Sequence, residues 1–325
     1  MTNFLDAIGH VLDGIHQTSG LPPGKLGDVV IAPGILGSNL SDAGGIQVWP
    51  SLDISLNRLR LPSNQDNLLL PSGLHSVYRP LRETLEQHWR VHEFSYDWRD
   101  NIGRSADALR NFIHDRDMTG KVHIVAHSMG GLVARMALHD EPTLLAGGRL
   151  VMLGTPNHGS IIALLALSSQ LGASAFFKLL ASFAPNVNAM AVADTWPGFY
   201  ELMPCPFHDP SFHDLYSKPP AVLNVNFTRA AEDFHRLLDG LPTPNGTVYI
   251  GGAGLPTADG SVLPANGDGV VSHNRGLLRD ALTFLVPGDH ATLPANIIVR
   301  TALTPLLHTG TAAILAPFSH PSPST

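Results

Sequence analysis

Strand-like and helix-like segments alternate along the chain. Short apolar runs, several of them rich in β-branched residues, occur at 28–33, 121–126, 150–153, 247–250 and 282–286. Residues 129–139 place apolar side chains on one face at helical spacing, and residues 296–307 are also helix-like. This alternation predicts an α/β fold, in which a mostly parallel central sheet is flanked by crossover helices.

The alternation is interrupted between the third and fourth strand-like runs. We therefore expect one α/β domain with a core at 28–160 and 221–309 and an inserted cap or lid at 161–220. Residues 1–20 have apolar positions at helical spacing and are expected to form an N-terminal helix. Residues 317–325 are rich in Pro and Ser and are expected to form a flexible tail.

Residues 161–183 form a strongly apolar stretch within the expected cap. Its 23 residues include one charge, Lys178, so its length approaches that of a membrane span. A transmembrane span is disfavoured, because it would place the motifs on its two sides across a bilayer from each other. The alternatives are a buried helix and a lid helix that responds to a lipid surface. In the lid alternative, Phe176 and Phe177 are candidate substrate contacts.

Composition indicates a globular protein with a sizeable core. Apolar residues make up 44% and charged residues 14% of the 325 residues, which excludes disorder of the whole chain. The formal net charge is −7 and no basic cluster occurs, so nucleic acid is not an expected partner. One cysteine, Cys205, excludes an intramolecular disulfide and a Cys-based zinc site.

No cofactor and no metal site are predicted. Asp268 lies in a Gly-flanked turn, but this turn lacks the ligand spacing of a calcium-binding loop. Residues 1–20 lack the basic and apolar regions of an export signal, so a cytoplasmic location is expected, with peripheral membrane contact left open.

The sharpest local pattern surrounds Ser128. Residues 121–131 read KVHIVAHSMGG and are followed directly by a helical pattern. A Ser at a strand-to-helix turn, with small residues such as Ala126 and Gly130 two positions away, is typical of a nucleophile elbow. The helix that begins at Met129 would direct its N-terminal N–H groups at the site, where they suit a developing oxyanion.

A nucleophilic Ser needs a general base, and chain order selects one of the 17 histidines. In this architecture the acid and the His follow the Ser, in loops after later strands. His290 follows the last strand-like run and is the candidate base, while His273 is the rival. His127 is expected to point away from the site because it flanks Ser128, and His158 lies at the entry to the cap.

The acid is expected between the last two strand-like runs. Asp268, in the turn Gly267–Gly269, is the candidate, and Asp259 is the alternative. Asp289 is discounted, because its neighbour His290 is too close in sequence for it to orient the imidazole ring. A tight turn without catalytic function is the other interpretation of the Asp268 segment.

The loop after the first strand-like run is expected to complete the oxyanion hole. Leu36 is the candidate N–H donor there, together with Met129 beside the nucleophile. Ile35 and Trp49 are expected to contact the substrate.

Several motifs occur in a fixed order. They are PGILGS at 33–38, VWP at 48–50, FSYDWR at 94–99, AHSMGG at 126–131, GTPNHGS at 154–160, GLPT at 254–257, GDG at 267–269 and PGDH at 287–290. This set, spread over about residues 28–308, resembles the lecithin:cholesterol acyltransferase-like branch of the α/β-hydrolases, which contains phospholipases, acyltransferases and lipase-like bacterial relatives. The resemblance implies an α/β-hydrolase fold, a mobile lid, a triad of Ser128, Asp268 and His290, and oxyanion N–H groups at Leu36 and Met129.

Two positions depart from the family pattern. Secreted members carry disulfides, which Cys205 alone cannot form, and Ser95 stands where relatives usually have Pro. Neither residue belongs to the implied triad. Asp97 and Arg99 are expected to form a structural ion pair, with Trp98 packed beneath the cap.

The leading hypothesis is a serine hydrolase that cleaves carboxylic esters, in particular lipid esters, through an acyl-enzyme. Water or an alcohol can accept the acyl group, so hydrolysis by a lipase, phospholipase or esterase and transfer by an acyltransferase both remain open. The alternative is a non-catalytic interaction protein with the same fold. The expected partners are an ester substrate and, transiently, a lipid surface.

Overall fold

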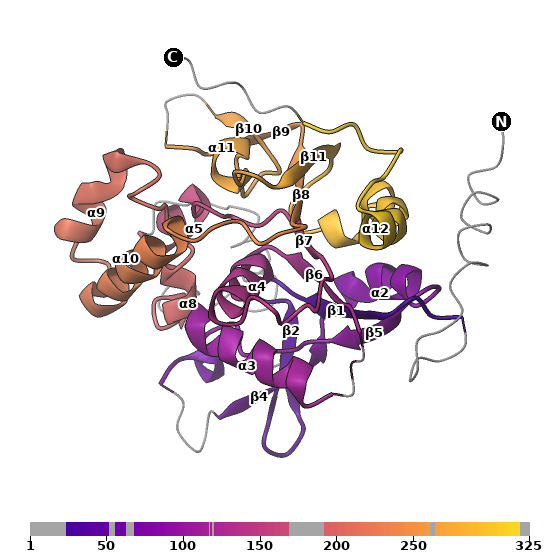
Figure 1. Ribbon diagram of the computed structural model, residues 1–325. Helices are drawn as coiled ribbons and strands as arrows, with labels where there is room; N and C mark the ends of the chain where they lie inside the picture. Colours follow the sequence, from indigo (N-terminus) through magenta and orange to yellow (C-terminus); the bar gives the residue numbers. More distant parts are fainter. Residues whose placement is uncertain are drawn as a thin grey trace, which may run out of the picture.

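A central sheet of six parallel strands organises the protein (Figure 1). The computed structural model describes residues 24–51, 56–62, 68–116, 118, 120–168, 192–260 and 264–318. In spatial order the strands are β11 (Leu282–Pro287), β8 (Val248–Ala253), β7 (Leu150–Leu153), β6 (Val122–His127), β1 (Asp28–Ala32) and β5 (Arg90–Glu93). Each neighbouring pair is parallel, which confirms the expected class of fold.

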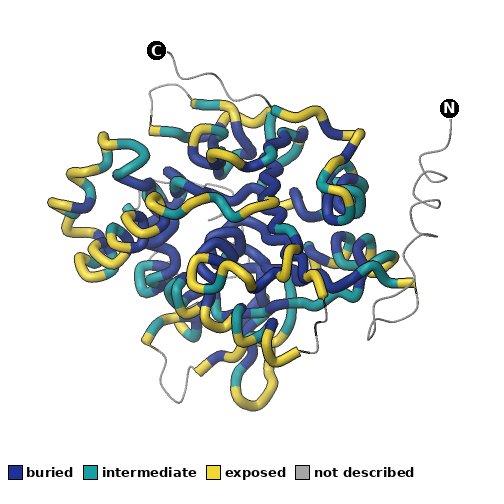
Figure 2. Tube along the Cα trace, viewed as in Figure 1, coloured by how far each residue is buried: buried dark blue, intermediate teal, exposed yellow. Residues whose placement is uncertain are grey.

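Alternate residues of the strands supply two separate hydrophobic clusters, one on each face of the sheet. In β1, Val29 and Ile31 belong to one cluster, and Val30 and Ala32 belong to the other. Because successive side chains of a strand point to opposite faces, a sheet buried on both sides needs such continuous apolar runs. Figure 2 shows the result as a dark central layer between partly exposed helices.

Helices cover both faces of the sheet. Helices α2 (Arg79–Leu85) and α12 (Ile297–Thr309) pack on the cluster that contains Ile31. Helices α3 (Ile102–His114) and α4 (Met129–Asp140) pack against each other and on the opposite cluster. Local signals set where they begin: the side chain of Asn101 caps α3 by accepting from the N–H of Arg104, and that of Asn296 caps α12.

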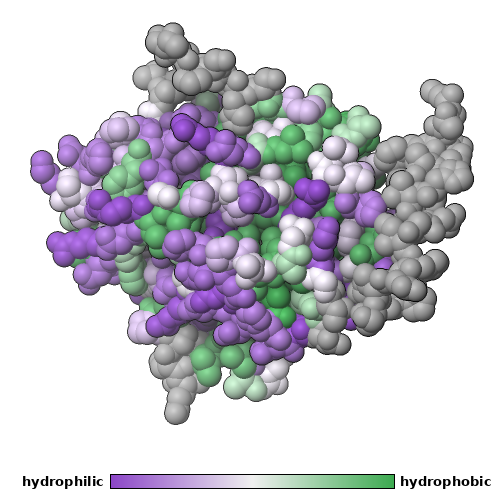
Figure 3. All heavy atoms as spheres, viewed as in Figure 1, coloured by the Kyte–Doolittle hydropathy of each residue, from purple (hydrophilic) through white to green (hydrophobic). Residues whose placement is uncertain are grey.

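Two small antiparallel sheets flank the central one. The first contains β3 (Gln47–Trp49), β2 (Ser38–Asp42) and β4 (Leu69–Leu74), and the second pairs β9 (Leu255–Thr257) with β10 (Ala265–Gly267). The remaining short elements are η1 (Leu56–Leu59), η2 (Ser76–Tyr78), α11 (His273–Gly276) and η4 (Leu293–Ala295). On the face drawn in Figure 3, apolar side chains gather at the lower edge, over β4.

The region between β7 and β8 carries α5 (Ile161–Leu167), α8 (Pro197–Tyr200), η3 (Pro210–Phe212), α9 (His213–Ser217) and α10 (Val225–Asp239). A single continuous helix over 161–183 was expected; its first turns are present as α5, but this helix ends at Leu167, so the expected continuity is wrong. The Ser168 hydroxyl donates back to the carbonyl of Leu164, so Ser168 closes the helix end. Residues 169–191, with Phe176 and Phe177, lie outside the described residues, as do 1–23 and 319–325. None of the helices among the described residues is both long and apolar enough to cross a bilayer.

Candidate active site

Ser128 occupies the sharp turn between β6 and α4. Its φ of 52° and ψ of −126° lie outside the backbone regions that residues with a side chain usually adopt. A Cβ atom on Gly130 would lie 2.5 Å from the carbonyl oxygen of Ala32, so a larger residue cannot occupy that position. The close approach of β1 therefore dictates the small residue of the predicted elbow.

His290 reaches Ser128 from the loop after β11. Its Nε2 atom lies 2.8 Å from Oγ of Ser128. The neighbouring Asp289 side chain accepts a hydrogen bond from the N–H of Thr292, so it supports the loop and does not orient the imidazole. The structure thus places His290, and not its neighbour, within hydrogen-bond distance of the hydroxyl.

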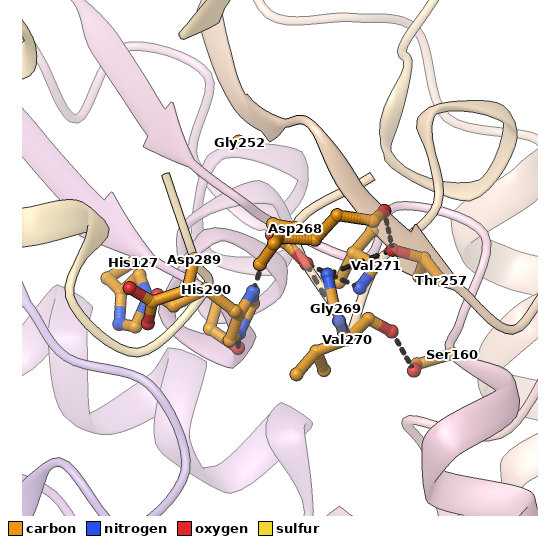
Figure 4. A network of polar contacts seen from close by, with 12 residues as sticks. His127, Ser160, Gly252, Thr257, Asp268, Gly269, Val270, Val271, Asp289 and His290 are labelled. Carbon is orange, nitrogen blue, oxygen red and sulfur yellow. Dashed lines mark hydrogen bonds and ion pairs between the residues drawn. The ribbon is translucent and has the colours of Figure 1, made fainter. Parts of the chain in front are cut away.

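Asp268 lies on the other side of the imidazole ring, directly after β10. Its Oδ2 atom is 2.8 Å from Nδ1 of His290, while Oδ1 accepts from the N–H groups of Val270 and Val271 at 2.9 and 2.7 Å (Figure 4). The turn is held from outside by Thr257, which accepts from the N–H of Gly269 at 2.9 Å. Asp268, His290 and Ser128 therefore form one continuous chain of hydrogen bonds.

The environment of Asp268 favours its charged form. Burial alone would raise the pKa of this carboxyl, but the adjacent His290 ring and the N–H groups of Val271 and Val270 lower the pKa below its usual range. The group is therefore a carboxylate at neutral pH. A carboxylate accepts the Nδ1–H bond of the imidazole, which leaves Nε2 with a lone pair toward the Ser128 hydroxyl.

The rival acid and base are engaged elsewhere. Asp259 forms an ion pair with Arg275 at 3.0 Å and accepts from the hydroxyl of Ser272. His273 has its Nε2 atom 3.2 Å from the carbonyl oxygen of Gly252. Of the candidates considered for base and acid, the structure brings His290 and Asp268 to Ser128.

The residues expected to supply the oxyanion donors lie near Ser128, since Met129 follows it directly and Leu36 lines the same cavity. Met129 is the first residue of α4, so its N–H lies at the positive end of the helix dipole. Leu36 has a φ of 63°, and its carbonyl oxygen accepts from the indole N–H of Trp49 at 2.8 Å. A Cβ atom on Gly34 would lie 2.8 Å from Cβ of Ser128, which shows how closely this loop approaches Ser128.

A cavity of about 390 Å³ opens beside Ser128 and is lined mainly by apolar side chains. Its volume falls in the range of ~300–1,000 Å³ that is common for small-molecule sites. The expected contacts Ile35 and Trp49 line it, as do Ile162 and Ala163 of α5. The other lining residues are Leu36, Gly37, His75, Val77, Tyr78, His127, Ser128, Pro156, Ser160, Phe199, Leu202, Val270, Val271, His290, Ala291 and Thr292.

The expectation that His127 points away from the site is wrong. Its ring lines the cavity and lies 5.1 Å from the ring of His290, measured between centroids. The hydroxyl of Tyr78, which sequence analysis missed, lies 2.8 Å from Nδ1 of this histidine. The backbone leaves the strand at Ser128, so simple strand alternation cannot predict the direction of the preceding side chain.

The turn at Asp97 has the structural role expected of it. The Arg99 guanidinium is buried and forms an ion pair with the Asp97 carboxylate at 2.7 Å. The ring of Trp98 packs edge to face against both Trp49 and Trp196, at centroid distances of 5.9 and 5.0 Å. These edge-to-face contacts connect Trp49, in the wall of the cavity, to Trp196 at the start of α8.

Potential metal ligands are scattered in the described part of the chain. No group of three or more His, Cys, Asp or Glu side chains there is arranged to hold a metal ion. Cys205 is buried, and burial raises the pKa of its thiol.

Comparison with known proteins identifies the fold. A model described as the alpha/beta hydrolase family matches residues 68–296. The crystal structure of the Tle4-Tli4 complex is similar over 84% of this chain and 96% of that chain, with a TM-score of 0.61 and 15% identity. The mature lipase BlEst2 of Bacillus licheniformis is similar over 90% of this chain and 95% of that chain, with a TM-score of 0.50 and 18% identity.

A yeast protein provides a closer match in sequence over a shorter range. The protein named uncharacterized protein YJR098C, from Saccharomyces cerevisiae, is 32% identical over 154 residues, which cover 40% of this chain. The match spans 23% of the length of that protein.

Proposed function

This chain belongs to the alpha/beta hydrolase family, and on that premise we propose that it is a serine hydrolase that cleaves carboxylic esters through an acyl-enzyme. The observation that carries the proposal is the hydrogen-bonded chain from Asp268 through His290 to Ser128, which ends at an apolar cavity. The resemblance of the motifs to the lecithin:cholesterol acyltransferase-like branch supports the same assignment.

In the proposed reaction, Oγ of Ser128 attacks the ester carbonyl while Nε2 of His290 takes the hydroxyl proton. The Asp268 carboxylate stabilises the imidazolium that forms. The N–H groups of Leu36 and Met129 hold the oxyanion of the tetrahedral intermediate. The intermediate collapses as His290 gives its proton to the leaving alkoxide, which departs as an alcohol.

The acyl-enzyme is then resolved by the reverse sequence of proton transfers. His290 removes a proton from water, the resulting nucleophile attacks the acyl carbonyl, and Ser128 regains its proton as the carboxylic acid leaves. An alcohol in place of water gives a new ester by the same steps. Hydrolysis and acyl transfer therefore share the same residues and differ in the acceptor.

The cavity supports an ester with an apolar acyl group as the substrate class. The wall formed by Ile35, Trp49, Ile162 and Phe199 stabilises an aliphatic chain at about 0.8 kcal/mol for each buried methylene. A lipid ester satisfies this requirement, and a lipase is among the structural neighbours. Because α5 supplies part of the wall, the region 161–220 is proposed to act as a lid that exchanges its apolar contacts for those of a lipid surface.

Hydrolysis of a series of p-nitrophenyl esters of increasing acyl length tests the proposal. Activity is expected to rise with acyl length and to be lost in Ser128→Ala, a small change that leaves the cavity intact. Inclusion of a short alcohol measures transfer, because the new ester appears beside the free acid. A folded wild-type protein without activity on the whole series would contradict the proposal and favour a non-catalytic interaction protein.

A further inference from the structure

The chemistry of the acceptors determines the proton positions in a second chain of hydrogen bonds beside the triad. Nε2 of His127 lies 3.0 Å from the carbonyl oxygen of His290. A carbonyl oxygen can only accept, so Nε2 carries the proton. Desolvation lowers the pKa of this imidazole to about 3, so the ring is neutral and its Nδ1 atom has a lone pair.

The same reasoning orients the Tyr78 hydroxyl. Its oxygen is 2.8 Å from Nδ1 of His127, so the hydroxyl donates to that atom. The backbone N–H of Gly34 donates to the Tyr78 oxygen at 2.9 Å. Donors and acceptors therefore run in one direction, from Gly34 through Tyr78 and His127 to the carbonyl of His290.

One end of this chain is the loop that carries Leu36. The carbonyl oxygen of Gly34 accepts from the N–H of Gly37 at 3.0 Å, which closes a turn around Leu36 at its positive φ. The contact of Gly34 with Tyr78 therefore holds the turn that contains Leu36, the proposed oxyanion donor. A shift of this turn changes the position of that donor relative to Ser128.

The other end is the backbone of the general base. The backbone carbonyl of His290 accepts from the His127 ring. The backbone N–H of His290 donates to the carbonyl oxygen of Asp268 at 3.0 Å. The peptide groups on both sides of this residue are thus held while its ring reaches Ser128. Loss of the His127 contact would leave this carbonyl with the N–H of Leu293, at 3.4 Å, as its remaining partner.

We propose that Tyr78 and His127 are positioning residues that connect the oxyanion loop to the loop of the general base across Ser128. This inference rests on the proposed function, because it assigns a role within the same site. Neither residue exchanges a proton with the substrate. Their contribution is to fix the positions of the Leu36 donor and the His290 ring relative to Ser128. A misplacement of a catalytic group by ~1 Å can cost ~10²-fold in rate.

Two substitutions remove the contact between Tyr78 and His127 from either side. Tyr78→Phe keeps the ring and deletes the hydroxyl. His127→Gln keeps a donor near the position of Nε2 and deletes the acceptor at Nδ1. His123→Gln is the matched control, because His123 lies on the same strand, is buried, and uses Nδ1 to accept from the N–H of Arg149 at 3.0 Å.

With a short soluble ester, kcat of Tyr78→Phe and of His127→Gln is expected to fall ~10–100-fold while KM stays near the wild-type value. The double variant is expected to be no slower than the slower single variant, because both substitutions break the same contact between Tyr78 and His127, and Tyr78→Phe alone also removes the acceptor of the Gly34 N–H. His123→Gln is expected to keep the wild-type kcat per folded protein. Unchanged kcat in both folded single variants, additive losses, or an equal loss in the control would overturn the inference.

The assay separates this inference from the proposed function. A wild-type protein with no Ser128-dependent hydrolysis contradicts the proposed function. Amide hydrogen exchange of the Gly34 and Leu36 N–H groups then still tests the connection: faster exchange in Tyr78→Phe than in His123→Gln supports it, and equal exchange overturns it. If Tyr78→Phe does not fold, His127→Gln is used for both measurements.

Discussion

Two polar networks in the interior of the protein contain histidine. In the triad network, which consists of Asp268, His290 and Ser128, each member passes a hydrogen bond to the next, and the last atom is a hydroxyl at the edge of a cavity. We call the second the anchor network, which consists of Arg135, Asn157, His158, His208 and Arg275. Its residues lie on α4, in the loop after β7, before η3 and on α11.

The side chains of the anchor network contact other groups within the protein. Nε2 of His158 donates to the carbonyl of Leu277 at 3.1 Å, and its ring stacks on that of His208 with 3.8 Å between centroids. Arg135 donates to the Asn157 side chain at 3.1 Å, and the Arg275 guanidinium meets the Asp209 carboxylate at 2.8 Å. The imidazole of His158 has a backbone carbonyl as its partner, whereas the imidazole of His290 faces the hydroxyl of Ser128, so burial of histidine alone does not indicate catalysis.

The comparison is tested most strongly by removing one histidine from each network. His290→Ala is expected to lower kcat by ~10³-fold or more, by analogy with triad deletions in other serine hydrolases. His158→Ala is expected to lower stability and to leave kcat per folded protein near wild type. Kinetics on a short ester, with the folded fraction measured by circular dichroism, decides between the two. An inactive but folded His158→Ala would contradict the distinction, as would an inactive His273→Ala.

A second pair of substitutions compares the carboxylates. Asp268→Asn is expected to lower kcat by ~10³–10⁴-fold, because an amide favours the wrong tautomer of the imidazole. Asp259→Asn removes a partner of Arg275 and is expected to affect stability and leave kcat unchanged. Near-normal turnover in Asp268→Asn, with Asp259→Asn inactive, would assign the acid to Asp259.

The third expected effect is on stability. The Arg275 side chain is fully buried and pairs with Asp209 and Asp259, which are themselves partly exposed. Arg275→Met is expected to lower the free energy of unfolding by ~1–3 kcal/mol, because the two carboxylates lose their partner but retain some access to water. Urea denaturation measures the loss. A loss of kcat per folded protein in this variant would show that the anchor network also controls the site.

The smallest effect concerns acid stability. Desolvation lowers the pKa of His158 to about 3 from an ordinary 6.5. Between these values the unfolded chain binds a proton at this residue and the folded protein does not, so stability falls as the pH falls. His158→Gln keeps a donor for Leu277 and is expected to reduce this dependence by up to ~1.4 kcal/mol per pH unit. An unchanged slope of unfolding free energy between pH 6 and pH 4 would contradict the neutral assignment.

Sequence predicted the elements whose signals are local. Five of the six sheet strands are predominantly apolar runs, and the small residue at Gly130 is dictated by the approach of β1. The sixth strand, β5, was missed because Arg90 and Glu93 give an edge strand with no apolar run. The pair β9 and β10 is short and partly exposed, so its pattern was too weak to predict.

The candidate site likewise contains residues that the sequence predicted and residues that it missed. His290 and Asp268 follow from chain order, because the loops after parallel strands meet at one edge of the sheet. Tyr78 was missed because its contacts with Gly34 and His127 join residues 44 and 49 positions apart, and no local pattern encodes such a pairing. The direction of the His127 ring depends on the turn at Ser128 and on these partners.

The most direct test of the central claim is covalent labelling of Ser128 with a fluorophosphonate, followed by intact-mass and peptide mass spectrometry. The account predicts one label per chain, carried by the peptide that contains Ser128. Labelling should be absent in Ser128→Ala, strongly slowed in His290→Ala and unchanged in the anchor-network variant Arg275→Met. A folded wild-type protein that takes up no label, or a label on another residue that persists in Ser128→Ala, would contradict the assignment of Ser128 as the nucleophile.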